Sequence, residues 1–551
     1  FFVNQIIACY IISKYNFIII FNDKTYVFIF KLHLTKKIKS IDMKNKSLIY
    51  IFSLAGLLSI TACSSDFLDV PVQGAGTAAT DPNFVENLVT GVYNTLLSGD
   101  AFGSGDTHGI AFISTTNIMS DDADKGSTTN DQIGIIGELD NFLHGPTNIF
   151  VGSLWNGHYN AIAKCNQAIK ALETATVDET TKNKWLGEVR FFRGYYYFNL
   201  VRYYGGVPAV LRVPESAKDA NDDPAFQTRA TVDDIYKIII EDLEFSVQNT
   251  PLRNQTQAGR VNKGTAQSML AKVYLYRKNW QKVIELTTEV INSGQYALLN
   301  DYAKIWRFAG NNSSESIFEV QTGTFNNTDF GVRGYCVWQG PRVGGKGGWT
   351  DLGFGFCTPS RQFVDSYEPG DIRKDATVII IDDSGTHKGT ILYDGYRIPS
   401  KDSIENYFYN YKAYHSELKK DEPYLGNRDN KQKNIHILRF ADVILMQAEA
   451  ANELGDASLA ISNLNQIRNR AGLEDIAPAQ GTELREAIWK ERRYELALEH
   501  DRFFDIVRQG KAGQIMRAAG KNFVDGKHEL LPIPALQIEL SGNRLAQNPG
   551  Y

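Results

Sequence analysis

Apolar residues recur at intervals of three and four residues between residues 81 and 302, and this spacing constrains the fold more than any other feature of the sequence. It places apolar side chains on one face of an α-helix. The helices predicted in this way lie around residues 84–96, 155–169, 185–204, 231–248 and 262–294. We therefore expect a mainly α-helical protein.

In two stretches, small and large residues alternate in a pattern that is typical of paired helices. They are residues 263–297 and residues 439–472, and each resembles a tetratricopeptide unit. A helix pair of this kind cannot bury its apolar faces alone. We expect the two pairs to stack together, although a long segment separates them in the sequence.

Residues 311–436 have a different composition, with many Gly and Pro and short β-branched runs at 317–320 and 377–381. This pattern predicts a loop-rich lobe with a few short strands. The expected fold is therefore a tetratricopeptide-like helical-hairpin scaffold with this lobe inserted, followed by helices and a C-terminal extension over residues 437–551. A further stretch, 98–150, is rich in Gly, Asp, Ser and Thr, and is predicted to be a long functional loop.

The first 80 residues are interpreted as leader and tether. Residues 1–42 precede the first methionine and are interpreted as translated upstream sequence. Residues 43–62 have a basic start and an uncharged apolar run, which is too short to span a membrane and is typical of a secretory signal. Cys63 follows Ala62, so we expect a lipoprotein signal peptide, lipidation of Cys63 and a lipidated tether over 63–80.

Loss of residues 1–62 removes eight lysines and two aspartates, so the formal charge falls from -5 to -11. A surface this acidic argues against nucleic acid as a partner, because phosphate binding depends on clustered Lys and Arg. Once Cys63 is lipidated, the thiols that remain, Cys165, Cys336 and Cys357, are too few to form a disulfide framework. The fold must therefore be stabilised by its core.

Four segments resemble the SusD/RagB family. They read GEVRFFRGYYYFNLVRYYGGVP at 187–208, RFADVILMQAEAANELGDASLAISNLNQIRNRAG at 439–472, ERRYELALEHDRFFDIVRQG at 491–510, and LLPIP followed by QNPGY at the C-terminus. The resemblance implies a SusD-like N-terminal helical region over 81–310 and a RagB/SusD C-terminal region over 311–551.

The same resemblance implies a function. It predicts a non-catalytic lipoprotein of the outer membrane, facing outside, which captures oligosaccharides for a SusC-like TonB-dependent barrel transporter. Two alternatives stay open: a RagB-like protein that captures peptides, and a pure helical-repeat interaction scaffold. The charged residues of the family segments, such as Arg193, Arg492 and Glu495, are predicted to form structural ion pairs, since the Arg fork binds carboxylates bidentately.

Sugar rings have an apolar face bordered by hydroxyl groups, so a capture site needs exposed aromatic side chains with planar polar groups beside them. Two regions offer such residues. The candidates in the first region are Phe102, Asp106, His108, Asn117 and Asp121, and those in the second are Tyr335, Trp338, Gln339, Arg342, Trp349 and Phe354. Trp338 and Trp349 are the principal candidates; the alternative is that they anchor a lobe with little other core.

No cofactor is expected. Residues 340–347, GPRVGGKG, lack the Ser or Thr that a phosphate loop needs after its Lys. Asp122 and Asp124 allow at most an irregular calcium site, because Ile133 stands where an EF-hand needs its bidentate Glu. The sequence has no HExxH zinc motif and no GxSxG nucleophile motif. An enzyme is not expected.

Overall fold

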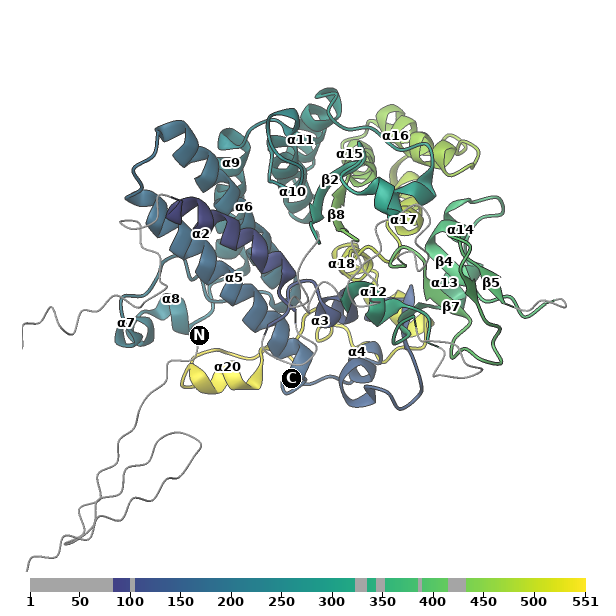
Figure 1. Cartoon of the computed structure of the whole chain (residues 1–551), viewed down its shortest axis with the longest axis horizontal. Helices are drawn as coiled ribbons and strands as arrows, with labels where there is room; N and C mark the ends of the chain where they lie inside the picture. Colours follow the sequence, from purple (N-terminus) through teal and green to yellow (C-terminus); the bar gives the residue numbers. More distant parts are fainter. Residues whose placement is uncertain (1–82, 100–104, 323–333, 343–351, 385–388, 415–432) are drawn as a thin grey trace, which may run out of the picture. The chain divides into compact units, whose positions relative to one another are not determined.

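The computed structural model describes residues 83–99, 105–322, 334–342, 352–384, 389–414 and 433–551 (Figure 1). The part of the chain from Gly76 to Tyr551 forms one compact unit. Its described residues are mostly helical, as predicted, with short paired strands.

The longer helices include those that form the two predicted hairpins, over residues 263–297 and 439–472. They are α2 (Phe84–Tyr93), α5 (Ile149–Glu173), α6 (Glu179–Tyr204), α9 (Val232–Asn249), α10 (Lys263–Tyr276), α11 (Trp280–Asn292), α15 (Phe440–Glu453), α16 (Ala457–Arg470) and α17 (Gly481–Glu495). The shorter ones are α3 (Ile110–Ile113), α4 (Glu138–Asp140), α7 (Ala217–Asp222), α8 (Pro224–Gln227), α12 (Gly334–Gln339), α13 (Arg361–Asp365), α14 (Arg373–Thr377), α18 (Arg502–Arg508), α19 (Ala512–Ala518) and α20 (Ala535–Leu540).

The helices pack in a continuous series. Helix α5 packs on α6, α6 on α9, α9 on α10, and α10 on α11. Helix α11 then packs on α15, which also contacts α16 and α17 (Figure 1). The expectation that the two hairpins stack is confirmed, because α11 and α15 are in contact although residues 293–439 separate them.

Local sequence defines several helix starts and close helix contacts. Thr231 and Asp234 form a capping box at the start of α9, and the Asn262 side chain accepts a hydrogen bond from the backbone N–H of Thr265 at 3.1 Å. Gly194 lets α6 approach α9, since a Cβ there would lie 3.2 Å from Leu243. These residues explain why the helices begin and meet where they do.

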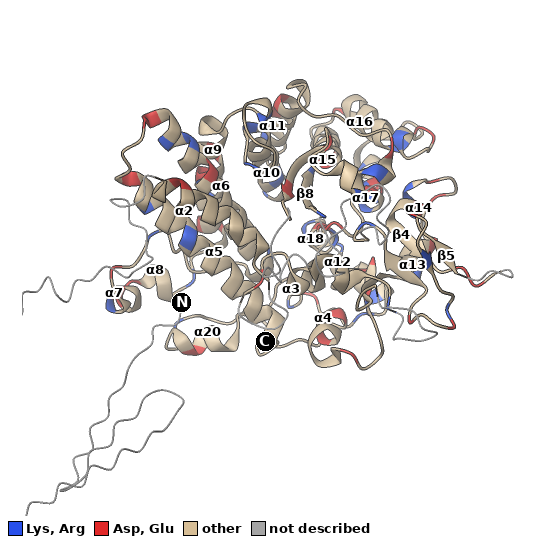
Figure 2. Ribbon diagram, viewed as in Figure 1, with Lys and Arg blue, Asp and Glu red and all other residues tan. Residues whose placement is uncertain are grey.

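Buried ion pairs join the helices, as predicted for the charged family segments. Arg193 on α6 binds both carboxylate oxygens of Asp242 on α9, at 2.7 and 2.8 Å. Arg492 on α17 binds Asp505 on α18 at 2.7 Å and also pairs with Asp442 on α15. Lys, Arg, Asp and Glu lie among one another around α17 and α18 (Figure 2).

Strands occur mainly in the inserted lobe and form four antiparallel pairs. They are β1 (Ala123–Gly126) with β3 (Phe356–Pro359), β2 (Ser316–Val320) with β8 (Ile435–Arg439), β4 (Val378–Ile380) with β7 (Phe408–Asn410), and β5 (Thr390–Ile391) with β6 (Arg397–Ile398). The register pairs Ala123 with Pro359 and Val378 with Asn410. The β2–β8 pair joins both ends of the lobe to the helical scaffold.

The prediction of an irregular loop over residues 98–150 is wrong for its described part. This stretch contains α3, the π-helical turns η3 (Ser114–Ile118) and η4 (Ile133–Gly137), β1 and α4. Asp106 accepts hydrogen bonds from the backbone N–H groups of Gly109, at 2.7 Å, and Ala111, at 3.0 Å, and so starts α3. The polar composition of residues 98–150 resembles that of a loop, but the polar groups of the described part form hydrogen bonds inside the core.

Candidate ligand-binding site

The candidate site is centred on Trp338, near the end of α12. Trp338 is half-buried, and its ring centroid lies 4.9 Å from that of Phe354 and 5.9 Å from that of Phe356. The Phe354 side chain is also half-buried. The three rings form an aromatic cluster that is partly open to solvent, and Trp338 and Phe354 are its accessible members.

Glycines allow the segment after α12 to fold back onto it. The backbone N–H of Phe354 donates to the carbonyl of Val337 at 2.7 Å, and the N–H of Gly355 donates to that of Gly340 at 2.9 Å. A Cβ on Gly353 would lie 2.4 Å from the Val337 carbonyl oxygen, which no other residue allows. The Gly-rich composition of this stretch thus serves the close approach of two backbones.

Planar polar side chains lie near Gly355, the residue between Phe354 and Phe356, where a Cβ would lie 3.0 Å from Cβ of Arg342 and 3.6 Å from Cα of Ser127. The guanidinium of Arg342 donates to the Ser127 hydroxyl at 2.5 Å and forms an ion pair with Asp131. The side chains of Arg342 and Asp131 are 25% and 26% exposed, so both reach solvent. Asn406 donates to the carbonyl of Ser127 at 3.5 Å. Segments distant in sequence therefore meet at this point.

The other two predicted residues of α12 face inward. The Tyr335 hydroxyl lies 3.0 Å from Nε2 of His500, and the Gln339 amide accepts from Asn410 at 2.7 Å. Both side chains are buried. They hold α12 against the core. The sequence predicted that both would be exposed, and that prediction is wrong. Trp349 lies outside the described residues.

The first group of predicted residues is also buried, apart from Phe102, which lies outside the described residues. Asp106 caps α3, and His108 contacts Tyr195. Asn117 accepts a hydrogen bond from the backbone N–H of His500 at 3.0 Å, and Asp121 binds Arg502 at 2.8 Å. Because each is at most 5% exposed, none is the exposed platform that the sequence suggested.

Sequence reasoning missed Phe356, Ser127, Asp131 and Asn406. Ser127 and Asp131 lie just after β1, and Phe356 begins β3. The β1–β3 pairing therefore brings these three residues together. No local pattern marks that pairing, because β1 reads Ala-Asp-Lys-Gly and contains no β-branched residue.

No metal centre is found in the described part of the chain, where no group of three or more His, Cys, Asp or Glu is placed to hold an ion. Asp122, a candidate for irregular calcium, instead pairs with Arg493 at 2.6 Å. A helix that is both long and apolar enough to cross a membrane is likewise absent from the described residues.

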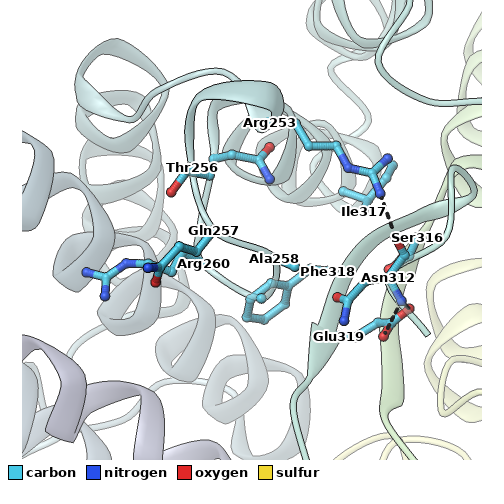
Figure 3. A pocket seen from close by; sticks show the side chains of 12 residues that line it. Arg253, Thr256, Gln257, Ala258, Arg260, Asn312, Ser316, Ile317, Phe318 and Glu319 are labelled. Carbon is cyan, nitrogen blue, oxygen red and sulfur yellow. Dashed lines mark hydrogen bonds between the residues drawn. The ribbon is translucent and has the colours of Figure 1, made fainter.

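A separate pocket of about 190 Å³ lies between residues 253–260 and β2 (Figure 3). Arg253 in its wall donates to the backbone carbonyl of Ser313 at 2.6 Å, and Arg260 pairs with Glu188 at 2.7 Å. Its volume is below the roughly 300 Å³ at which small-molecule pockets usually begin. This small volume disfavours the pocket as a ligand site.

Several histidines are buried in the core, and His500 contacts Tyr335 of α12. Nδ1 of His108 lies 3.0 Å from the Leu96 carbonyl, which only accepts, so Nδ1 carries the proton and Nε2 accepts from the Tyr195 hydroxyl at 2.8 Å. Burial, together with neighbouring charge, lowers the pKa of His108 and of His500 to about 3. Burial also lowers the pKa of His158 to about 4.

Stability is expected to fall as pH is lowered from about 6.5, the ordinary imidazole pKa, towards about 4. In that window the unfolded imidazoles bind protons that the folded ones do not, so acid favours unfolding. Each fully buried imidazole contributes up to about 1.4 kcal/mol per pH unit. Urea titrations from about pH 7.5 to about pH 5 test this. A His158→Phe variant should show a shallower slope, and stability that does not change with pH would contradict the expectation.

Comparisons with known proteins agree with this architecture. The family model described as "Starch-binding associating with outer membrane" matches residues 66–275, and that described as "SusD family" matches residues 314–551. SusD-like protein P2 of Formosa agariphila is 27% identical over 466 residues, which cover 79% of this chain and 86% of that protein.

Solved structures share the fold. One described as "Laminarin binding SusD-like protein" has a TM-score of 0.69 and 26% identity, covering 85% of this chain and 99% of its own. A SusD superfamily protein of Parabacteroides distasonis has a TM-score of 0.69 and 26% identity, covering 87% and 100%. The chain is thus of the class in which helical hairpins carry an inserted loop-rich lobe. It belongs to the SusD family, as its sequence resemblance predicted.

Proposed function

We propose that this protein captures oligosaccharides at the cell surface without cleaving them. The observation that carries the proposal is the half-buried ring of Trp338, which packs on Phe354, next to Gly355 and the partly exposed Arg342 beside it. An aromatic face suits the C–H face of a sugar ring, and planar polar groups suit its hydroxyls. The solved relative named for laminarin binding supports this ligand class.

The proposal includes delivery of the captured glycan to a SusC-like TonB-dependent barrel transporter. Family membership supports this partner, and the outer-membrane association in the matched family description supports the location. A lipid anchor on Cys63 would hold the protein to the outer membrane, facing outside. A soluble domain held by acyl chains can collect a ligand near a transporter without itself spanning the bilayer.

Replacement of Trp338 by alanine tests the binding site. We expect glycan affinity to fall by about 1–3 kcal/mol, by analogy with loss of an aromatic ring that stacks on a planar ligand. Calorimetry with laminarin-derived and starch-derived oligosaccharides measures the change. Trp338→Phe is the matched control, because it keeps an aromatic face. A lower melting temperature with unchanged affinity would instead show that Trp338 serves only the core.

Replacement of Cys63 by alanine tests the anchor. The variant should move from the membrane fraction to the soluble fraction, because the thiol that receives the lipid is lost. Cell fractionation measures this, and Cys165→Ala is the control, since Cys165 is buried in α5 and should not affect anchoring. Membrane retention of the Cys63 variant would refute lipidation at this residue.

A further inference from the structure

A second pocket, here called the hairpin pocket, lies where the two helical hairpins meet. It has a volume of about 320 Å³ and lies at the ends of α10, α15 and α18, the start of α11, and one side of α17. This volume is within the range of about 300–1,000 Å³ that is usual for small-molecule sites. None of its lining residues belongs to the Trp338 cluster.

Two tryptophans from different helices line the hairpin pocket. Trp280 is the first residue of α11, directly after the turn in which Lys278 has a φ of 55°. Trp489 lies on α17. Both rings are half-buried, so part of each is accessible. The indole N–H of Trp489 is buried without an acceptor among the described residues, which is unusual for a buried indole.

Four of the five charged side chains that line the hairpin pocket neutralise one another, and the fifth, Lys278, is an exposed residue of the turn before α11. Arg508 binds both oxygens of Glu449, at 2.6 and 2.9 Å. Arg485 binds both oxygens of Glu453, at 2.5 and 2.8 Å. Because each carboxylate has its own bidentate arginine, the pairs form fixed planar polar surfaces with little net charge.

This lining favours a neutral ligand that has both an apolar face and many hydroxyl groups. A purely apolar ligand would leave the Glu–Arg surfaces desolvated without new hydrogen bonds. A charged ligand would compete with pairs that are already satisfied. A sugar ring can place its C–H face on an indole and its hydroxyls on the arginines, carboxylates and the N–H of Trp489 after a small ring rotation.

We propose that the hairpin pocket is a second saccharide-binding site, separate from the Trp338 cluster. The inference deepens the proposed function and rests on it for the class of ligand. Two sites on one chain would let the protein hold different parts of one long glycan, and this raises avidity without tighter contacts at either site.

Fluorine NMR of protein labelled with 5-fluorotryptophan tests the hairpin pocket directly. The chain contains seven tryptophans, so each resonance can be assigned by a single Trp→Phe substitution. Laminarihexaose and maltohexaose are the probes. We expect saturable shifts of the Trp280 and Trp489 resonances, and we expect these shifts to persist in Trp338→Ala protein. A Trp489→Leu variant should raise the half-saturating concentration read at Trp280 about fivefold or more.

The possible outcomes separate the two proposals. Shifts at Trp338 with none at Trp280 or Trp489 would overturn the second site and leave the proposed function standing. Shifts at the hairpin pocket alone would support the second site and overturn the placement of glycan at Trp338. If neither probe shifts the resonance of any of these three tryptophans, both proposals are overturned. Melting temperatures of the variants show whether each remains folded.

Discussion

Replacement of Arg439 by alanine is expected to lower the free energy of unfolding by about 3–5 kcal/mol. The Arg439 side chain is 1% exposed and binds Glu315 at 2.6 Å, Glu495 at 3.0 Å and Glu499 at 2.7 Å. Removal of the guanidinium leaves three buried carboxylates with less compensating charge. The cost comes mainly from those carboxylates, because an uncompensated buried charge is far less stable than a paired one.

Urea titration of the variant and the parent measures this effect. Arg212→Ala is the matched control, since Arg212 also pairs with two carboxylates, those of Asp219 and Asp223, but at the surface. Exposed ion pairs contribute little to stability, so the control should have nearly the same free energy of unfolding as the parent. Equal stability of the Arg439 variant and the parent would contradict the structural role assigned to the buried network.

Replacement of Leu270 by proline is expected to destabilise the protein by about 3 kcal/mol or more. Leu270 is buried in the middle of α10, where proline removes a backbone hydrogen bond and clashes with the preceding turn. Helix α10 contacts α9, α11 and α15, so the damage should spread to both hairpins. Circular dichroism during thermal unfolding measures the loss.

Glu179→Pro is the control for the Leu270 variant. Glu179 is the first residue of α6, and the residue before it, Asp178, has extended backbone angles, φ −64° and ψ 152°. Proline is tolerated at this first helical position. Similar unfolding of the two variants would mean that proline is harmful wherever it is placed, and that α10 has no special role.

The helical part of the fold could be predicted because its signals are local. The spacing of apolar residues identified α5, α6 and α9, and alternation of small and large residues identified the hairpins. The packing of α11 on α15 could also be predicted, since a hairpin that stands alone cannot bury its apolar face. The buried role of Arg193 was predictable because Arg binds carboxylates well in helix interfaces.

The candidate site could be predicted only in part. Trp338, Arg342 and Phe354 are partly exposed, as a binding role requires, and aromatics among glycines are a local signal; ligand binding by these residues stays a prediction. Asp131 was missed, since it reaches Arg342 through a strand pairing between segments more than 200 residues apart. The burial of Asp106 and His108 was also missed, because a polar sequence does not show that its polar groups satisfy one another.

The most direct test of glycan capture is a binding screen of residues 65–551, which include the whole compact unit, on an array of glycans and peptide pools. Calorimetry on the hits then gives affinities for the parent and for Trp338→Ala. The proposal predicts a glycan hit that the Trp338 variant weakens. Binding of peptides alone, or of nothing on the array, would contradict glycan capture and favour a peptide-capturing protein or an interaction scaffold.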